Sequence, residues 1–337
     1  MTLTRFAPSP TGYLHLGHAY SALFAFETAK RKDGKFLLRI EDIDPTRCKP
    51  EFTEAIFEDL RWLGLSWEEP VRKQSEHMAD YAQALAKLHS LGVLYPCACT
   101  RADIAREVKE SAHAPHLPPH GPDGPIYPGT CRKKVSALEK SELSIWQAQR
   151  KAPRPPQEGE GFGVRVESGF KRQTRPLTPT LSPSRGQGSH ATLTEPANAI
   201  SANWRLDIAK ALQLTGPLFW HDRDKGRIEA HPEDFGDVVL ARKDVPTSYH
   251  LSVTVDDHLQ GITLVTRGED LFRATDIHRL LQALLGYETP DYRHHPLLKD
   301  ASGKRFAKRD KALALRDLRA NGATPEQMRQ SVLSPPP

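Results

Sequence analysis

The stretch that decides the fold is Arg5-Phe6-Ala7-Pro8-Ser9-Pro10-Thr11-Gly12-Tyr13-Leu14-His15-Leu16-Gly17-His18. A short apolar run before it predicts a β-strand, and the apolar spacing of residues 19–32 predicts a helix. A glycine-containing turn between strand and helix gathers free N–H groups and the positive helix end, which favours phosphate binding. His15 and His18 lie on one side of the first helical turn and can donate to phosphate oxygens. These residues alone are equally compatible with a capped strand-to-helix turn that carries two solvent-exposed histidines and binds no phosphate.

Composition indicates an ordinary globular protein. The 337 residues suffice for two or three compact units, with 26% charged and 38% hydrophobic residues. No run approaches the roughly 20 apolar residues of a membrane span, and the N-terminus lacks a secretory segment, so we expect a cytoplasmic protein without a membrane partner. The four cysteines form no disulfide framework at this length. The net charge of +5 permits a polyanionic partner without requiring one.

An alternation of strands and helices predicts a doubly wound parallel α/β sheet. Residues 35–40 form an apolar run typical of a buried parallel strand, and Glu41, Asp42 and Asp44 follow it, where ligands of such sheets bind. For Asp42 and Asp44 a solvated acidic loop is an equal alternative. Residues 51–63 and 79–91 are amphipathic, and strands are expected at 235–242 and 262–271. A helix is expected at 276–285, with Ile277, Leu280, Leu281 and Leu284 pointing inward.

A cysteine cluster suggests a metal site. Cys97 and Cys99 are followed at a distance by Tyr127 and Cys131, which together offer three thiolates and a phenol. Structural zinc takes four ligands, and thiolates dominate such sites. The intervening loop also carries three histidines that could replace Tyr127, namely His113, His116 and His120. The alternative is that all four cysteines of the chain, Cys48 included, are reduced thiols without metal and Tyr127 is an ordinary tyrosine.

The part of the chain with the weakest signal is residues 151–203. Residues 169–201 are rich in Pro, Ser, Thr and Gly and poor in apolar residues, so they can neither continue a helix nor contribute to a core. We expect a disordered, dispensable insertion there.

The stretch quoted first closely resembles the first signature of class I aminoacyl-tRNA synthetases in its glutamyl form, with His15 to His18 as its His-x-Gly-His core. The second signature of that family, Lys-Met/Leu-Ser-Lys, is similar to Arg305-Phe306-Ala307-Lys308. Lys308 keeps the second lysine, whereas Arg305 replaces the first lysine and Ala307 lacks the serine hydroxyl. These departures put the full catalytic rate in question more than the family.

The resemblance implies roles for individual residues. It implies catalytic roles for His15, His18 and Lys308, and ATP binding by His15, Gly17, His18 and Lys308. It implies one structural Zn²⁺ held by Cys97, Cys99, Tyr127 and Cys131. The residues implied to bind glutamate are Arg5, Phe6, Ala7, Pro8, Ser9, Glu41, Tyr249 and Arg267. Because arginine forms bidentate bonds to carboxylates, Arg5 and Arg267 favour glutamate over an uncharged amide.

The resemblance also implies the architecture. Residues 1–95 and 235–290 would be the two halves of a Rossmann-type catalytic domain. Residues 96–234 would be an inserted zinc-binding α+β subdomain that includes the 169–201 insertion. Residues 291–337 would hold the loop of the second signature and a short helical C-terminal segment that contacts the RNA stem.

The implied enzyme is a ligase of the aminoacyl-tRNA synthetase type. It would use ATP with Mg²⁺ to activate L-glutamate and, since no anticodon-binding region follows, would pass glutamate to queuosine in the anticodon of tRNA(Asp). We expect a monomer. A shortened enzyme charging a tRNA 3′ end, a non-catalytic relative that binds glutamate or tRNA, and a nucleotidyltransferase sharing only the His-x-Gly-His turn are the alternatives.

Overall fold

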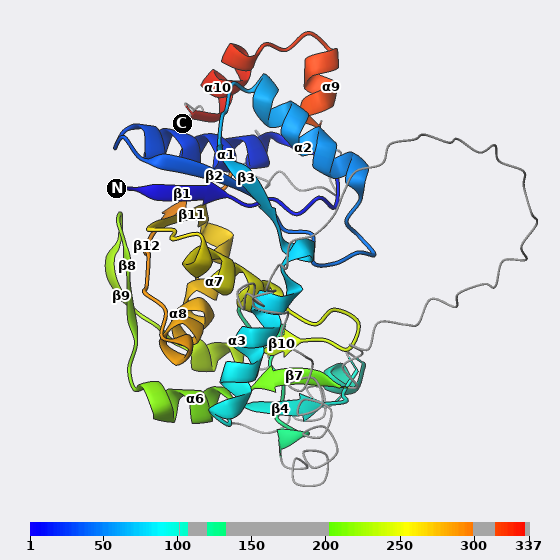
Figure 1. The fold of residues 1–337 in the computed structure, drawn as a ribbon, viewed down its shortest axis with the longest axis vertical. Helices are drawn as coiled ribbons and strands as arrows, with labels where there is room; N and C mark the ends of the chain where they lie inside the picture. Colours follow the sequence, from blue (N-terminus) through cyan, green and yellow to red (C-terminus); the bar gives the residue numbers. More distant parts are fainter. Residues whose placement is uncertain (101, 107–119, 133–201, 299–313, 334–337) are drawn as a thin grey trace, which may run out of the picture.

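The computed structural model describes residues 1–100, 102–106, 120–132, 202–298 and 314–333 (Figure 1). The expected insertion at 169–201, the loop histidines His113 and His116, and the second signature with Lys308 lie outside these residues. Within the described part of the chain, no helix has the length and apolar character needed to cross a membrane.

The first half of the fold is a parallel sheet in the order β1-β2-β3 with its crossover helices. The elements are β1 (Leu3–Phe6), α1 (Leu16–Lys30), β2 (Lys35–Ile40), α2 (Pro50–Trp62), β3 (Glu68–Lys73) and α3 (Met78–Ser90). The strand predicted at 35–40 and the helices predicted at 51–63 and 79–91 are confirmed. Helix α1 begins three residues before the predicted start, because His15 caps its N-terminus.

The second half places β11 (Leu264–Gly268) beside β1 (Figure 1). The Thr263 N–H donates to the Leu3 carbonyl at 3.1 Å, and the Arg5 side chain donates to the Thr266 carbonyl at 3.2 Å. Strand β11 pairs in parallel with β12 (Asp291–His295), which pairs with β8 (Phe219–Asp222), and β8 with antiparallel β9 (Gly226–Glu229). Strand β1 thus lies between β2, the next strand of the chain, and β11 from the second half. Such a switch point opens a crevice at the carboxyl ends of the strands.

Two helices connect the strands of the second half, α7 (Tyr249–Leu259) and α8 (Ala274–Leu285). The four residues expected to point inward from α8, Ile277, Leu280, Leu281 and Leu284, are all buried. Strand pairing crosses the boundaries expected at residues 234 and 290, since β8 and β12 belong to the same sheet as β11. The division into four units therefore stays a prediction.

A second, antiparallel sheet contains β4 (Leu94–Cys97), β7 (Asn203–Leu206) and β10 (Val239–Ala241). Helix α6 (Ile208–Thr215) follows β7, and the short hairpin of β5 (His120–Gly121) and β6 (Gly124–Pro125) lies before the second pair of metal-site residues. The strand predicted over 235–242 is limited to Val239–Ala241. Residues Pro232–Phe235 form a 3-10 turn instead, and Gly236 takes a φ of 62° that ends it.

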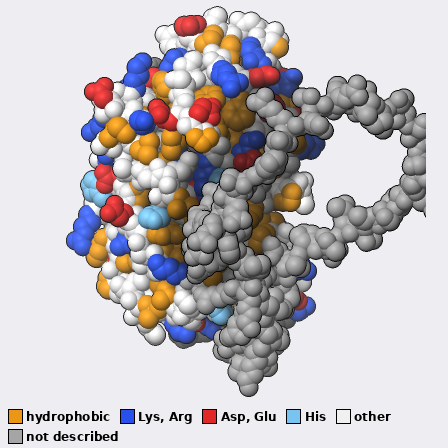
Figure 2. Space-filling model, viewed as in Figure 1, with side chains coloured by type: hydrophobic (Ala, Val, Ile, Leu, Met, Phe, Trp, Pro, Cys, Tyr) orange, Lys and Arg blue, Asp and Glu red, His pale blue; other side chains and the backbone are white. Residues whose placement is uncertain are grey.

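The helices α9 (Leu315–Ala320) and α10 (Pro325–Leu333) confirm the expected short helical C-terminal segment. Leu315 and Val332 are buried in the same cluster as Leu23 of α1 and Leu60 of α2. Figure 1 shows both helices beside α1 and α2. On the outer face in Figure 2, Lys and Arg side chains are interspersed with Asp and Glu, in keeping with the mild net charge of +5.

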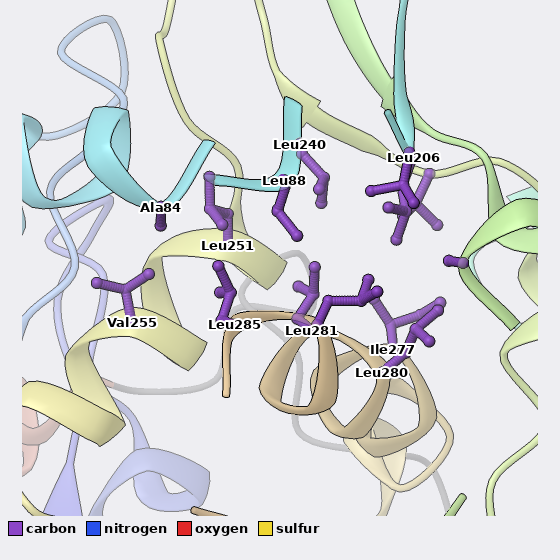
Figure 3. Close-up of a cluster of buried hydrophobic side chains, with 14 of the residues drawn as sticks. Ala84, Leu88, Leu206, Leu240, Leu251, Val255, Ile277, Leu280, Leu281 and Leu285 are labelled. Carbon is purple, nitrogen blue, oxygen red and sulfur yellow. The ribbon is translucent and has the colours of Figure 1, made fainter. Parts of the chain in front are cut away.

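The largest core cluster lies between α3, α7, α8 and the antiparallel sheet (Figure 3). Ala84 and Leu88 of α3, Leu251 of α7 and Leu281 of α8 point toward one another there. This core fixes the position of the strand and helix ends that surround the crevice.

Replacing Leu281 with Ala should lower the free energy of unfolding by about 2–5 kcal/mol, because Leu281 is 0% exposed and its loss leaves a cavity. Leu214→Ala in α6 is the matched control, since Leu214 is 56% exposed and should cost less than about 0.5 kcal/mol. Denaturant titration of the two variants would measure the difference. Equal losses would contradict the packing described for α8.

Candidate active site

A cavity of about 550 Å³ opens at the carboxyl ends of β1 and β11. Its lining joins the turn after β1, the start of α1, Glu41 after β2, Tyr249 at the start of α7, and Arg267 in β11. The turn is tied down by the Glu41 N–H, which donates to the Pro8 carbonyl at 3.0 Å. The cavity therefore gathers every residue expected to bind glutamate and, of the four residues expected to bind ATP, all but Lys308. The sequence-predicted residues in its lining are Arg5, Phe6, Ala7, Pro8, Ser9, His15, Gly17, His18, Glu41, Tyr249 and Arg267.

The two histidines of the signature form the N-terminal cap of α1. The Gly17 N–H donates to His15 Nδ1 at 3.1 Å, and the His15 N–H donates to His18 Nδ1 at 3.2 Å. A ring nitrogen that accepts a hydrogen bond carries no proton, so the neutral rings have their N–H at Nε2. The ring centroids are 3.8 Å apart, as expected for neighbours on one helical turn. The cap thus fixes both rings as Nε2 donors at the positive end of α1, where no acidic residue occupies the first turn.

Arg5 is neutralised within the protein. Its Nε donates to Asp257 Oδ1 at 2.8 Å and its Nη2 to Asp257 Oδ2 at 3.3 Å, and both side chains are buried. Asp257 also accepts from Arg39 Nη1 at 2.8 Å. Arg5 lines the cavity, but its main partner is a carboxylate of the protein.

Arg267 is held differently, by uncharged groups. Its Nε donates to His294 Nε2 at 3.2 Å, its Nη1 lies 3.1 Å from His278 Nδ1, and its Nη2 donates to the Thr275 hydroxyl. The residue is only 6% exposed, and within the described residues it forms no ion pair with an acidic side chain. A buried cation of this kind favours an anionic ligand.

Glu41 is a buried carboxyl group that lines the cavity, whereas Asp42 and Asp44 do not line it. Burial raises the pKa of Glu41 to about 7, although Arg39 and Arg5 act in the opposite direction. Asp42 accepts from the Ser75 backbone and hydroxyl, and Asp44 accepts from Thr46 and Arg47. The alternative of an acidic loop outside the ligand site is therefore the better account of Asp42 and Asp44, although their carboxylates are hydrogen-bonded within the protein.

The cysteine cluster has the dimensions of a tetrahedral metal site. The sulfur atoms of Cys97, Cys99 and Cys131 all lie within 4.8 Å of one another, and those of Cys99 and Cys131 are 3.4 Å apart. The Tyr127 hydroxyl is 3.5 Å from the sulfur atoms of both Cys97 and Cys99. Zn–S bonds of about 2.3 Å in a tetrahedron place sulfur atoms roughly 3.7 Å apart. The residues present therefore fit zinc, with Tyr127 rather than the exposed His120 beside the thiols.

Arg205 in β7 supports this cluster. Its Nε donates to Cys97 Sγ at 3.3 Å, and its guanidinium lies 3.9 Å from the centre of the Tyr127 ring. A cation at this distance stabilises a thiolate, the form that binds metal.

The residues that hold the two cavity arginines were not predicted from the sequence. His278 and His294 hold Arg267, and Asp257 holds Arg5. A pair of histidines at the end of a strand, His294 and His295, was a usable signal, because such ends face the ligand crevice. No sequence signal pointed to Asp257, since it lies inside helix α7, whose sequence has no unusual feature.

Comparison with known proteins agrees with the resemblance. A family model described as tRNA synthetases class I (E and Q), catalytic domain, matches residues 1–135 and 187–334. A glutamyl-Q tRNA(Asp) synthetase of Rhodobacter capsulatus is 42% identical over 98% of this chain and 99% of its own length. A glutamate–tRNA ligase of Coprothermobacter proteolyticus is 33% identical over 96% of this chain and 56% of its own length.

The fold is shared with a solved glutamate tRNA ligase from Elizabethkingia meningosepticum, crystallised with its amino acid. The TM-score is 0.66 at 23% sequence identity, and the match covers 99% of this chain and 60% of that chain. The expected class I Rossmann-type α/β fold is confirmed.

Changing Cys97 to Ser should remove bound zinc and lower the melting temperature, because the thiolate is replaced by a weak ligand in a buried cluster. Cys48→Ser is the matched control, since Cys48 lies outside the cluster. Elemental analysis of protein purified without chelator should find one zinc per chain in the wild type and control. A metal-free wild type with an unchanged melting curve would refute the assignment.

Binding of L-glutamate should weaken as the pH falls, because protonation of Glu41 removes a negative charge that can pair with an amino group. With a pKa of about 7, the ionised fraction and the affinity should drop about tenfold between pH 8 and pH 6. Glu41→Gln should bind weakly with a flat profile over this range. Calorimetry at several pH values would measure both, and a profile that persists in Glu41→Gln would assign the titration to another group.

Proposed function

The chain belongs to the class I tRNA synthetases for glutamate and glutamine, and on that premise we propose that it activates L-glutamate with ATP and transfers it to queuosine in the anticodon of tRNA(Asp). Glutamate, ATP with Mg²⁺ and tRNA(Asp) are then its substrates. All three meet in the cytoplasm, the location expected from the sequence. The expected monomeric state remains a prediction.

The observation that carries the proposal is the buried guanidinium of Arg267, which has no acidic partner among the described residues. Arg267 lines the cavity together with His15 and His18, the two histidines that cap α1. A side-chain carboxylate of the ligand would satisfy its charge. Tyr249 and Glu41 line the same cavity, and Glu41 would take the amino group. These three positions favour an amino acid with an acidic side chain.

In the proposed first step, the α-carboxylate of glutamate attacks the α-phosphorus of ATP and pyrophosphate leaves. No side-chain nucleophile is needed, so catalysis consists of positioning and of stabilising negative charge. His15 and His18 would donate from Nε2 to phosphate oxygens at the N-terminus of α1. Lys308, which lies outside the described residues, is proposed to neutralise charge on the phosphates.

The cysteine cluster would hold one structural zinc ion through Cys97, Cys99, Tyr127 and Cys131. It is built on β4 and the segment after β6, and none of its residues lines the cavity. Zinc would therefore stabilise the inserted subdomain and take no part in the reaction.

The name of the Rhodobacter capsulatus relative, similar over nearly its whole length, supports queuosine as the acceptor. The name of the Coprothermobacter proteolyticus relative supports the second candidate, transfer to a tRNA 3′ end. Recognition of an anticodon base requires that the base leave its stack and enter the cavity, which single-stranded loops permit.

The two acceptors can be separated with labelled glutamate and two matched preparations of tRNA(Asp), one with and one without queuosine. Each is used intact and after removal of the terminal adenosine. We expect labelling only with queuosine, independent of the terminal adenosine, and recovery of the label in the anticodon fragment after ribonuclease digestion.

Labelling that follows the terminal adenosine and ignores queuosine would establish 3′ charging instead. Pyrophosphate exchange, which needs no tRNA, tests the first step separately. Glutamate should exceed glutamine by roughly a hundredfold in kcat/KM, because an amide leaves the Arg267 charge unanswered. Equal rates would overturn the assignment of the cavity.

A further inference from the structure

The partners of Arg267 form two hydrogen-bond chains with fixed direction. Arginine only donates, so the nitrogens that face it, His278 Nδ1 and His294 Nε2, must be acceptors without a proton. A neutral imidazole then carries its proton on the other nitrogen. His294 Nδ1 lies 2.7 Å from Asp222 Oδ2, and His278 Nε2 lies 3.2 Å from His250 Nδ1. Both outer partners can accept, so each chain is self-consistent.

Both chains end on a carboxylate that does not touch Arg267. His250 Nε2 lies 3.0 Å from Asp123 Oδ2, on the exposed turn between β5 and β6. Asp222 is fully buried and accepts from the backbone N–H groups of Asp224 and Lys225 at 2.9 and 3.1 Å. These carboxylates orient the imidazoles while remaining separated from the guanidinium by one ring or two.

The surroundings of the two rings keep them uncharged. His278 and His294 are 3% and 4% exposed. Burial, and next the Arg267 charge, lower the pKa of His278 well below its usual value and that of His294 to about 4. The guanidinium is thus fixed by three groups that add no negative charge.

The number of unused donors matches a carboxylate. A guanidinium has five N–H groups, and the bonds to His294, His278 and Thr275 use three of them. The other two bond to no residue in the part of the chain that the structure describes. One remains on each Nη atom. A carboxylate takes two parallel N–H donors in a bidentate pair. Arg5 in the same cavity shows the opposite arrangement, because it has already spent such a pair on Asp257.

We propose that His278 and His294 are specificity-determining positioning residues, which hold Arg267 through uncharged acceptors and so reserve its charge for the side-chain carboxylate of the amino acid. They select glutamate over glutamine without touching either. The inference rests on the proposed activation of glutamate. Strands β11 and β12 and helix α8, which carry the three residues, lie together in the second half of the fold (Figure 1).

The test is a pair of variants that differ only in charge. His278→Asn places an amide oxygen near the position of Nδ1, and His278→Asp places a carboxylate oxygen there. The preference for glutamate over glutamine, as the ratio of kcat/KM in pyrophosphate exchange, should stay within about threefold of wild type in His278→Asn, whatever the absolute rate. In His278→Asp it should fall about a hundredfold, mainly through a higher KM for glutamate, because the new carboxylate occupies Arg267.

The same comparison applies to His294, with His294→Gln and His294→Glu as the matched pair for Nε2. The His294 pair replaces the His278 pair as the test if the His278 variants do not fold. A folded carboxylate variant that keeps the wild-type preference would overturn the proposal, as would an amide variant that loses the preference to the same extent as its carboxylate partner.

A third measurement requires no variant. Nitrogen-15 chemical shifts of the wild-type protein between pH 6 and pH 8 should show His278 protonated only at Nε2 and His294 only at Nδ1. A charged imidazole or the opposite tautomer at either position would overturn the proposal. If the wild type binds glutamate and glutamine equally by calorimetry, the proposed function fails as well. If the wild type prefers glutamate and both carboxylate variants keep that preference, the proposed function stands and only the role of the two histidines is refuted.

Discussion

The structure depends on the buried pairing of Asp257 with Arg5 and Arg39. These bonds join residues 252 and 218 positions apart and fasten α7 to the ends of β1 and β2. Burial alone would raise the pKa of Asp257, but the two guanidinium groups hold it below its usual value. Taking such charges out of water is costly, and their mutual bonds offset that cost only when the geometry is complete. One side of the cavity is therefore rigid before any ligand enters.

The cavity uses two arginines in opposite electrostatic settings. Arg5 is balanced by the protein and acts as a structural cross-link between the halves of the fold, whereas Arg267 is held by imidazoles and a hydroxyl. A sequence motif cannot distinguish these states, because both are arginines near strand ends. The distinction arises from what packs against each guanidinium, and only one of the two offers a net charge to a ligand.

The sequence predicted correctly those features of the structure that depend on residues close together in the chain. The turn from Arg5 to His18, the strand at 35–40 and the inward face of α8 depend on spacing and short-range geometry, and the structure has them as expected. The partners of Arg5 and Arg267 were missed because they come from α7, α8 and β12, and side-chain contacts across such separations leave no periodic signal. The strand expected from residue 235 begins only at Val239, because Gly236 adopts a turn conformation with a positive φ.

The packing of α10 on α1 and of α9 on α2 has a consequence for the order of folding. The outward face of α1 is covered by residues near Val332, and the Leu315 N–H donates to the Leu14 carbonyl at 2.8 Å, just before the signature histidines. During synthesis these contacts cannot form until some three hundred further residues have been added. Contacts of such high sequence separation are slow to form. Helix α1 therefore completes its native packing late, although its other core partners come from the first half of the fold.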